Sequence, residues 1–265
     1  MKPFPDIYVQ SYQVEVFNLL NNLTCVFAHP DDEFLAAGLL ARAKRIGYKT
    51  HIICGTNGER GRLKGQNFLG DKTEDLVTIR NREFKKSSKL LEVDSLKYLN
   101  LPDNKAAQWN LYDAVGELES ILLNIGPSII VTFNKNGGNN HPDHIGIHNI
   151  TVKAFKKIAS QNYKLYFGTL FPKQYSQANN ILQVPPQIID KITIDDNEVS
   201  KIIKLSNDEY KLKLNVIDVY RSQFPDEHGL YYKMPLKFLE MMAKYECYEA
   251  FDIEENQDIE IVNML

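Results

Sequence analysis

The stretch LTCVFAHPDDEFLAAGLLARAKRIG, Leu23–Gly47, joins an apolar run to an amphipathic one. The apolar run Leu23–Ala28 predicts a buried strand, and Asp32–Gly47 carries apolar residues at the spacing of a helix. Acids in its first turn, basic residues in its last turn and a terminal glycine agree with the helix dipole and with helix capping. Together these features predict a strand, a turn and a helix, which is the repeating unit of α/β folds.

The same alternation continues along the chain. Strands are predicted at Thr50–Gly55, Ser95–Leu99 and Ser128–Phe133, and helices at Glu74–Leu91, Leu111–Ile125 and His144–Ala159. Beyond them, Leu165–Leu170 resembles a strand, Pro185 and Pro186 interrupt the chain, and Asp208–Tyr220 resembles a helix. The pattern favours a mostly parallel sheet covered by helices. Because no linker, repeat or low-complexity tract is present, we expect one domain over residues 1–265, with a core at about 22–170 and a C-terminal elaboration at about 171–265.

The composition excludes several classes of protein. The chain has 265 residues, of which 43% are hydrophobic and 25% charged, so it can bury a sizeable core. Its net charge of −3 provides no positive field, and we therefore expect no nucleic-acid partner. No apolar run approaches the ~18 residues of a membrane-spanning helix, and the N-terminus lacks the pattern of a secretory signal. We expect a cytoplasmic protein whose three cysteines are reduced.

Histidines and acids gather where two of the predicted strands end. The first strand is followed by AHPDDE, Ala28–Glu33, and the fourth by a run that ends in HPDH, His141–His144. Ligands of a parallel sheet bind at the carboxyl ends of its strands, so both clusters lie at the same edge. Imidazoles and carboxylates there form the ligand set of a catalytic zinc. Either cluster alone is explained by a turn in which Asp caps a helix, and a His144–His148 pair at i, i+4 spacing remains open.

Five motifs, in order, carry a resemblance to a known family. They are AHPDDE (Ala28–Glu33), TNGERG (Thr56–Gly61), the R-x-x-E of Arg80 and Glu83, LNLPD (Leu99–Asp103) and HPDH (His141–His144). Together they resemble the PIG-L/LmbE-like de-N-acetylase family over roughly residues 20–160, and more weakly as far as the YRSQ of 220–223. The resemblance implies an α/β Rossmann-like three-layer sandwich. It also implies a zinc-dependent hydrolase that removes the acetyl group from N-acetylglucosamine-type conjugates.

Carried over position by position, the resemblance gives several motif residues a role. His29, Asp32 and His144 would hold Zn²⁺, with Fe²⁺ or another divalent ion as the alternative. Asp31 would be the general base for a metal-bound water, and a protonated His141 would stabilise the oxyanion or protonate the leaving amine. We therefore expect His141→Ala to lower turnover by about 10²–10³ while sparing most metal binding.

Three further residues are expected to contact the substrate, namely Arg80, Glu59 and Asn140. For Arg80 and Glu83 the alternative is a pair on the helix surface, because residues three apart share a helix face. Glu33 is explained equally by the helix dipole and by support of the metal site.

Two positions depart from the pattern of the family. Asn134 stands where many members carry an acid, which would remove a charge that orients a histidine ligand. Tyr220 replaces a histidine that is common before the S-Q pair. The C-terminal third matches little of the family, and the exact substrate therefore stays undetermined by the sequence.

Two other functions remain open. A metal-dependent hydrolase of another bond, such as a phosphoester, would need a second metal about 4 Å away, for which the sequence offers no obvious set of carboxylates. A non-catalytic sugar- or nucleotide-binding module is favoured only by the glycine-bearing loop at 55–65, which lacks the G-x-G-x-x-G pattern. The expected partner is a small-molecule amino sugar conjugate, and assembly as a homo-oligomer stays open.

Overall fold

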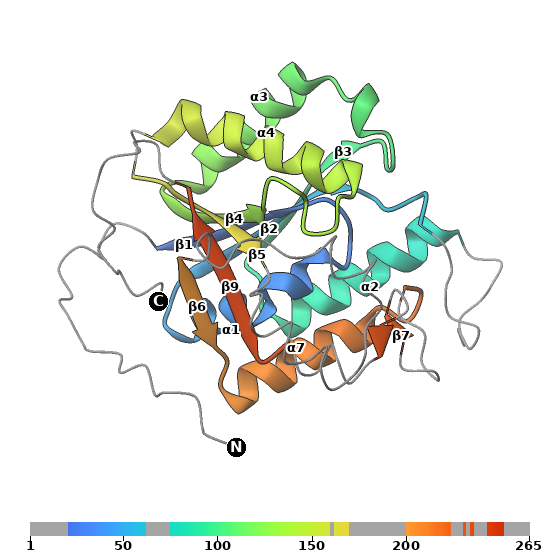
Figure 1. Cartoon of the computed structure of the whole chain (residues 1–265), viewed down its shortest axis with the longest axis vertical. Helices are drawn as coiled ribbons and strands as arrows, with labels where there is room; N and C mark the ends of the chain where they lie inside the picture. The colour runs from blue at the N-terminus through green and yellow to red at the C-terminus, as the bar shows by residue number, and fades with distance from the viewer. Residues whose placement is uncertain are drawn as a thin grey trace.

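The computed structural model describes residues 21–61, 75–159, 162–169, 200–223, 230–231, 234–235 and 243–251 (Figure 1). Within them, a seven-stranded sheet has the order β3-β2-β1-β4-β5-β9-β6. Its parallel strands are β1 (Asn22–Phe27), β2 (Lys49–Thr56), β3 (Ser95–Leu101), β4 (Ser128–Phe133) and β5 (Lys164–Thr169). Strand β9 (Tyr245–Ala250) is antiparallel to β5, and β6 (Lys201–Lys204) is antiparallel to β9. A separate antiparallel pair consists of β7 (Leu230–Tyr231) and β8 (Met234–Pro235).

Helices cover both faces of this sheet. On one face lie α3 (Leu111–Ile125) and α4 (Pro142–Ile158), and on the other lie α1 (Ala37–Arg45), α2 (Leu76–Leu90) and α7 (Asn207–Val219) (Figure 1). Two short 3₁₀ helices, η2 (Asp32–Ala36) and η3 (Ala106–Gln108), connect strands to helices. Every residue of β4 is buried, as expected for a parallel strand with a helical layer on each side. The predicted three-layer α/β sandwich with a mostly parallel sheet is confirmed.

The strand order reverses at β1, and at such a point doubly wound sheets open a crevice. Strand β1 pairs with β2 on one side, where Asn22 is opposite Lys49, and with β4 on the other, where Asn22 is opposite Ser128. The chain therefore leaves β1 toward one edge of the sheet and later returns to pair with β1 from the other direction. In such sheets the loops after the two diverging strands separate and leave room for a ligand. The two histidine clusters follow β1 and β4 and thus lie at this point.

One predicted helix differs from the structure. The sequence predicts a single helix over Asp32–Gly47, but residues 32–36 form η2, and α1 begins only at Ala37. The reason lies far along the chain, because the Glu246 carboxylate on β9 accepts hydrogen bonds from the backbone N–H groups of Gly38 and Leu39, both at 2.8 Å. These N–H groups are the unsatisfied donors of a helix N-terminus, and a carboxylate there also suits the helix dipole.

The other predicted elements of the first two thirds end within two residues of the observed ones. Strands β6, β7, β8 and β9 have no counterpart among the predicted elements. The sequence of β9, YECYEA, alternates polar and apolar residues only weakly. Pro185, Pro186 and residues 62–65 of the glycine-bearing loop at 55–65 lie outside the described residues. The cysteines Cys25, Cys54 and Cys247 are buried and carry no disulfide. No helix in the described part of the chain is both long and apolar enough to cross a membrane.

Candidate metal centre

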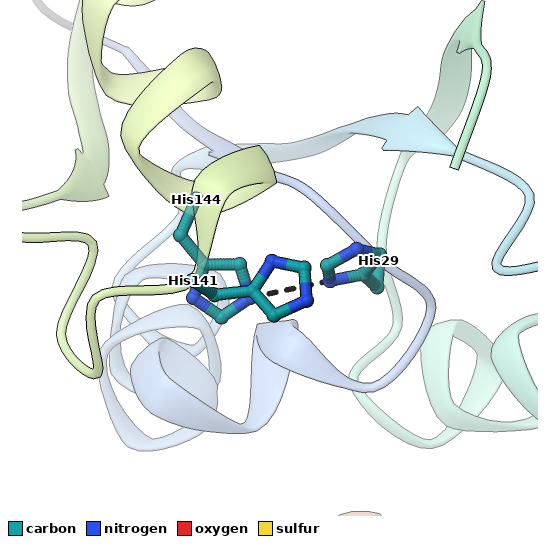
Figure 2. A group of neighbouring side chains, drawn as sticks. All are labelled: His29, His141 and His144. Atoms are coloured by element: carbon teal, nitrogen blue, oxygen red, sulfur yellow. Dashed lines mark hydrogen bonds between the residues drawn. The ribbon is translucent and has the colours of Figure 1, made fainter. Parts of the chain in front are cut away.

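The crevice between β1 and β4 collects the two clusters that the sequence singles out. His29 follows β1, and Asp32 opens η2 three residues later. His141 is the N-cap of α4, where its Nδ1 accepts a hydrogen bond from the Asp143 amide at 3.2 Å, and Pro142 takes the first helical position, which suits proline. His144 therefore lies within the first turn of α4, and Figure 2 shows its ring close to those of His29 and His141.

The three predicted ligands bring their side-chain atoms close together. His29 Nδ1 lies 3.2 Å from His144 Nε2 and 3.3 Å from an oxygen of Asp32, and His144 Nε2 lies 3.5 Å from the other Asp32 oxygen. Tetrahedral Zn²⁺ with ligands at about 2.0–2.2 Å would hold those ligand atoms roughly 3.3–3.6 Å apart. The observed separations thus fit one small divalent ion between two imidazoles and a carboxylate.

The outer nitrogen of each histidine is held by the protein. His29 Nε2 lies 3.2 Å from Asp103 and 3.2 Å from Asp143, and His144 Nδ1 lies 2.8 Å from the carbonyl oxygen of Gly137. When these outer nitrogens donate to their oxygen partners, the lone pairs of His29 Nδ1 and His144 Nε2 face the common point. Such outer partners fix the tautomer and the orientation of histidine ligands in metal sites.

Asn134 supports this arrangement through the loop before α4. Its side-chain oxygen accepts hydrogen bonds from the amides of Gly138 at 2.9 Å and Asn136 at 3.2 Å. These bonds hold the turn that carries the Gly137 carbonyl, the partner of His144. Gly137 has φ +64°, and a Cβ there would lie 2.7 Å from the Cβ of His144. An amide at position 134 therefore orients the histidine indirectly, through the backbone of the turn.

The electrostatics of the crevice favour a positive charge at the common point. Burial alone would lower the pKa of His29, but hydrogen bonds to three carboxylates raise that pKa well above its ordinary value. Burial alone would raise the pKa of Asp32, but the neighbouring His144 and His29 lower it. Burial lowers the pKa of His144 to about 4, so this ring is neutral at pH 7 and its nitrogen is a competent ligand. The carboxylates that favour a proton on His29 would also favour a metal cation at this point.

His141 lies beside these residues as a potential fourth partner. Its ring centroid is 4.9 Å from that of His29 and 4.9 Å from that of His144, and each of the three rings offers a nitrogen within 4.8 Å of the others (Figure 2). Burial, followed by the charge of His29, lowers the pKa of His141. A neutral ring that accepts at Nδ1 carries its proton on Nε2 and can donate it.

The alternative metal pair of His144 and His148 is not formed. His148 Nδ1 lies 2.8 Å from the carbonyl oxygen of Phe133, and its ring packs against Phe167 at a centroid distance of 4.7 Å. Among the described residues, His148 belongs to no group whose atoms converge for a metal.

Asp31, the expected general base, has an unusual backbone and a fixed side chain. Its φ is 126° and its ψ is −26°, a region that residues with a side chain rarely adopt. An oxygen of its carboxylate lies 3.1 Å from a terminal nitrogen of Arg80, and the same nitrogen donates to the carbonyl oxygen of Pro30 at 2.6 Å. Arg80 is only 4% exposed and also donates to the carbonyl oxygen of Gly58. Arg80 therefore contacts the protein at each of these points and orients Asp31.

Arg80 and Glu83 do not form the surface pair considered from the sequence. Both are buried, and the two oxygens of Glu83 accept hydrogen bonds from the amide of Ser222 at 2.8 Å and from its hydroxyl at 2.5 Å. The face of α2 that carries them packs toward the turn after α7 and not toward solvent. Glu59 and Asn140, the other expected substrate contacts, are exposed near the site, and Glu59 accepts from the amide of Asp103 at 2.8 Å.

Glu33 supports the site directly. It is fully buried, and burial raises its pKa to about 7. One carboxylate oxygen accepts hydrogen bonds from the hydroxyls of Ser87 and Tyr220, and the other accepts from the amide of Asp31 at 3.1 Å. Of the two explanations that the sequence left open, these contacts favour support of the site, because Glu33 links the Asp31 turn to α2 and to the turn after α7.

Sequence reasoning assigned no role to Asp103 and Asp143, the carboxylates that hold His29. Both belong to motifs that the sequence shows, and both lie at the strand edge that carries the histidines, since Asp103 follows β3 and Asp143 opens α4. This shared position was the available signal. The partnership of Glu33 with Tyr220 had no such signal, because 187 residues separate them.

Comparisons with known proteins identify relatives of this chain. The family model described as GlcNAc-PI de-N-acetylase matches residues 24–155. A 1D-myo-inositol 2-acetamido-2-deoxy-alpha-D-glucopyranoside deacetylase of Mycobacteroides abscessus is 30% identical over 209 residues, which cover 69% of this chain and 75% of that protein. A protein of the same name from Mycobacterium sp. (strain JLS) is 26% identical over 197 residues, which cover 67% of this chain and 64% of that protein.

The solved structure of N,N'-diacetylchitobiose deacetylase from Pyrococcus horikoshii resembles this one with a TM-score of 0.60 at 19% identity, covering 87% of this chain and 84% of that chain. At this identity the likeness concerns the fold. Together with the matched motifs and the sequence relatives, these findings show that the chain belongs to the PIG-L family of GlcNAc-PI de-N-acetylases.

Proposed function

We propose that this chain is a zinc-dependent hydrolase that removes the N-acetyl group from an N-acetylglucosamine-type sugar conjugate and releases acetate and a free amine. The observation that carries the proposal is the convergence of His29 Nδ1, Asp32 and His144 Nε2 at 3.2–3.5 Å. Asp31 directly precedes the ligand Asp32 in the chain, and Arg80 holds its carboxylate. Three ligands leave a coordination position for water, which is the arrangement of catalytic zinc sites.

The residues present fit the metal that this chemistry needs. When bound by His29, Asp32 and His144, the ion would lower the pKa of a water molecule to roughly 7 and polarise the amide carbonyl. Nitrogen and carboxylate ligands suit zinc and also Fe²⁺, so the choice of zinc rests on the tetrahedral fit of the three separations.

Two residues of this chain would move protons. The Asp31 carboxylate, oriented by Arg80 at 3.1 Å, would accept a proton from the attacking water as general base. His141, whose Nδ1 is occupied by the Asp143 amide, would donate the proton on Nε2 to the developing oxyanion or to the leaving amine. A neutral His141 ring can donate this proton. The doubly protonated, positively charged His141 that the family resemblance implies is therefore not required for this step.

A two-metal hydrolase is the second candidate, because the structure brings two more carboxylates to His29. Asp103 and Asp143 form, with His29, a group whose atoms lie within 4.8 Å of one another. Both acids, however, already accept backbone hydrogen bonds, Asp103 from Arg60 at 2.7 Å and Asp143 from Asn104 at 2.5 Å. A second ion would also require His29 to bind metals at both nitrogens as an imidazolate. We therefore favour one metal, with these acids orienting His29.

The proposed substrate class follows from the names of the relatives, which are deacetylases of amino sugar conjugates. The exposed residues Glu59 and Asn140 at the rim of the crevice are proposed to contact the sugar conjugate. Arg80 is buried, and we propose that it acts on the reaction by holding Asp31. Assembly as a homo-oligomer stays a prediction.

The test is acetate release from a panel of N-acetylglucosamine conjugates by zinc-loaded protein, chelator-treated protein and Asp31→Asn. Asparagine keeps the shape of aspartate and tolerates a positive φ better than most residues, so the variant removes the base with little strain. The control is Asp113→Asn, the same change at an exposed position of α3. This variant should release acetate at the wild-type rate.

Release that needs both the metal and Asp31 is the expected result. Release by the chelated protein, or equal release by Asp31→Asn, would contradict the proposed mechanism. No release from any conjugate by metal-loaded wild-type protein would contradict the proposed substrate class.

A further inference from the structure

The peptide group between Pro30 and Asp31 is held at both of its ends. Its carbonyl oxygen accepts a hydrogen bond from Arg80 at 2.6 Å, and its N–H donates to Glu33 at 3.1 Å. A peptide group is planar, so hydrogen bonds at its oxygen and at its N–H restrain the plane as one unit. The orientation of this plane sets φ of Asp31, and with it the direction in which the Asp31 side chain leaves the backbone.

This restraint matters because the backbone of Asp31 does not favour its observed conformation. Among the described residues with a side chain, the others with positive φ lie between 51° and 62°, in the ordinary left-handed region, whereas Asp31 has φ 126°. Such conformations persist only where the surroundings enforce them. Arg80 and Glu33 are the two side chains that hold the peptide before Asp31, and each is buried.

Glu33 in turn depends on residues from two other parts of the chain. Ser87 comes from α2 and Tyr220 follows α7, and both hydroxyls donate to the same oxygen of Glu33. This leaves the second oxygen for the Asp31 amide. Tyr220 is fully buried, so its ring has a single packed position from which the hydroxyl reaches Glu33.

We propose that Tyr220 is a positioning residue for Asp31, because its hydroxyl holds the Glu33 carboxylate where that carboxylate fixes the peptide between Pro30 and Asp31. The proposal rests on the proposed function in one respect, namely that Asp31 is the base. Its structural part concerns only hydrogen bonds within this chain and can be measured without any substrate.

The first experiment measures hydrogen exchange of the Asp31 amide in wild-type protein, Tyr220→Phe and Tyr248→Phe. Tyr248 is the matched control, since it is also buried and its hydroxyl donates at 3.0 Å to a buried carboxylate, that of Glu246, which caps α1. Both variants lose one hydroxyl and keep the ring. We expect exchange at Asp31 to accelerate about tenfold or more in Tyr220→Phe and to stay unchanged in Tyr248→Phe.

The second experiment measures kcat, KM and bound zinc for the same proteins on an accepted conjugate. We expect Tyr220→Phe to lower kcat on the order of tenfold, with KM and zinc content unchanged, since a displaced base slows the reaction and leaves binding intact. Tyr248→Phe should keep the wild-type kcat. In a Glu33→Gln background the further effect of Tyr220→Phe should disappear, because residues that act through one partner are not additive.

The outcomes separate the two proposals. Wild-type protein that deacetylates no conjugate, while Asp31 exchange accelerates only in Tyr220→Phe, would support the positioning role and contradict the proposed function. Unchanged exchange at Asp31 in Tyr220→Phe would overturn the positioning role, as would a fall in kcat no larger than in Tyr248→Phe or a full effect of Tyr220→Phe in the Glu33→Gln background.

Discussion

Single residues in the crevice adopt conformations that the site imposes. Asp31 holds φ 126° between Arg80 and Glu33, and Gly58 holds φ +67° against the guanidinium of Arg80. A Cβ at Gly58 would lie 2.6 Å from Cζ of Arg80, so only glycine allows the arginine to occupy its place. Gly58 thus helps to orient Asp31, because it leaves room for the Arg80 side chain that holds Asp31.

Gly58→Ala should therefore lower kcat by displacing Arg80 from Asp31. Gly47→Ala is its control, since Gly47 also has positive φ, at +94°, but a Cβ there would meet nothing within 4 Å. Both variants should lose about 1–2 kcal/mol of unfolding free energy from backbone strain. Only Gly58→Ala should lose activity, and equal kcat values in steady-state assays of the two variants would contradict this role.

Helix α2 carries polar side chains that point toward the protein interior. Arg80, Glu83 and Ser87 occupy positions i, i+3 and i+7 of α2, which lie on one helix face. That face is polar yet buried, because the Asp31 turn and the turn after α7 supply its partners. Periodicity alone assigns such a face to solvent, and only the partners reveal its direction.

The start of α1 depends on a buried ion pair between two elements. Glu246 on β9 caps the helix and also pairs with Lys213 on α7 at 2.7 Å, with both residues at most 5% exposed. Glu246→Gln would leave the Lys213 charge buried without its partner, which costs about 3–5 kcal/mol. Urea unfolding measures this loss. Glu119→Gln breaks an exposed pair with Lys157 and should cost less than about 1 kcal/mol, and similar losses in both variants would contradict the assignment.

The N-terminus of α7 should make stability depend on pH. Burial alone would raise the pKa of Glu209. Hydrogen bonds from Arg42, from the Ser206 amide and from Arg45 instead lower this pKa to about 2, below the ~4.3 of an unfolded chain. A lowered pKa stabilises the fold above the unfolded value and loses that effect as pH falls toward the folded value. Relative to Glu209→Gln, which keeps the capping box, wild-type protein should gain about 2–3 kcal/mol at pH 7.

Urea unfolding of both proteins between pH 7 and pH 2 tests this dependence. The difference in unfolding free energy should shrink as pH falls from about 5 toward 2. A difference that stays constant over this range would show that Glu209 stabilises α7 by packing and not by its charge.

At the scale of the whole molecule, the candidate ligands come from both sides of the point where the strand order reverses. His29 and Asp32 follow β1, and His144 belongs to α4, which follows β4. An ion held by all three would cross-link two halves of the sheet that are otherwise joined through β1. The carboxylates around it repel one another when the ion is absent, so the metal should stabilise the entire fold.

Removal of the metal should lower Tm. A free zinc concentration about 1,000-fold above Kd would add about 4 kcal/mol to the unfolding free energy, or roughly 10 °C in Tm for a chain of this size. Calorimetry with zinc and with chelator measures the shift. Asp32→Asn should abolish most of it, whereas Asp113→Asn should retain it, and an equal shift in both variants would place the ion elsewhere.

Local patterns in the sequence are sufficient to predict the layered α/β fold and to name the metal-site candidates. Apolar runs and amphipathic stretches report burial locally, and HPDD and HPDH follow strands whose ends share one edge in any parallel sheet. These patterns do not predict that Asp103 and Asp143 hold His29, that Glu246 starts α1 five residues late, or that Tyr220 reaches Glu33. These contacts join residues far apart in the sequence, from 74 positions for His29 and Asp103 to 208 positions for Gly38 and Glu246. Local periodicity carries no information on such pairs, and their geometry is decided only when the helical layers pack on the sheet.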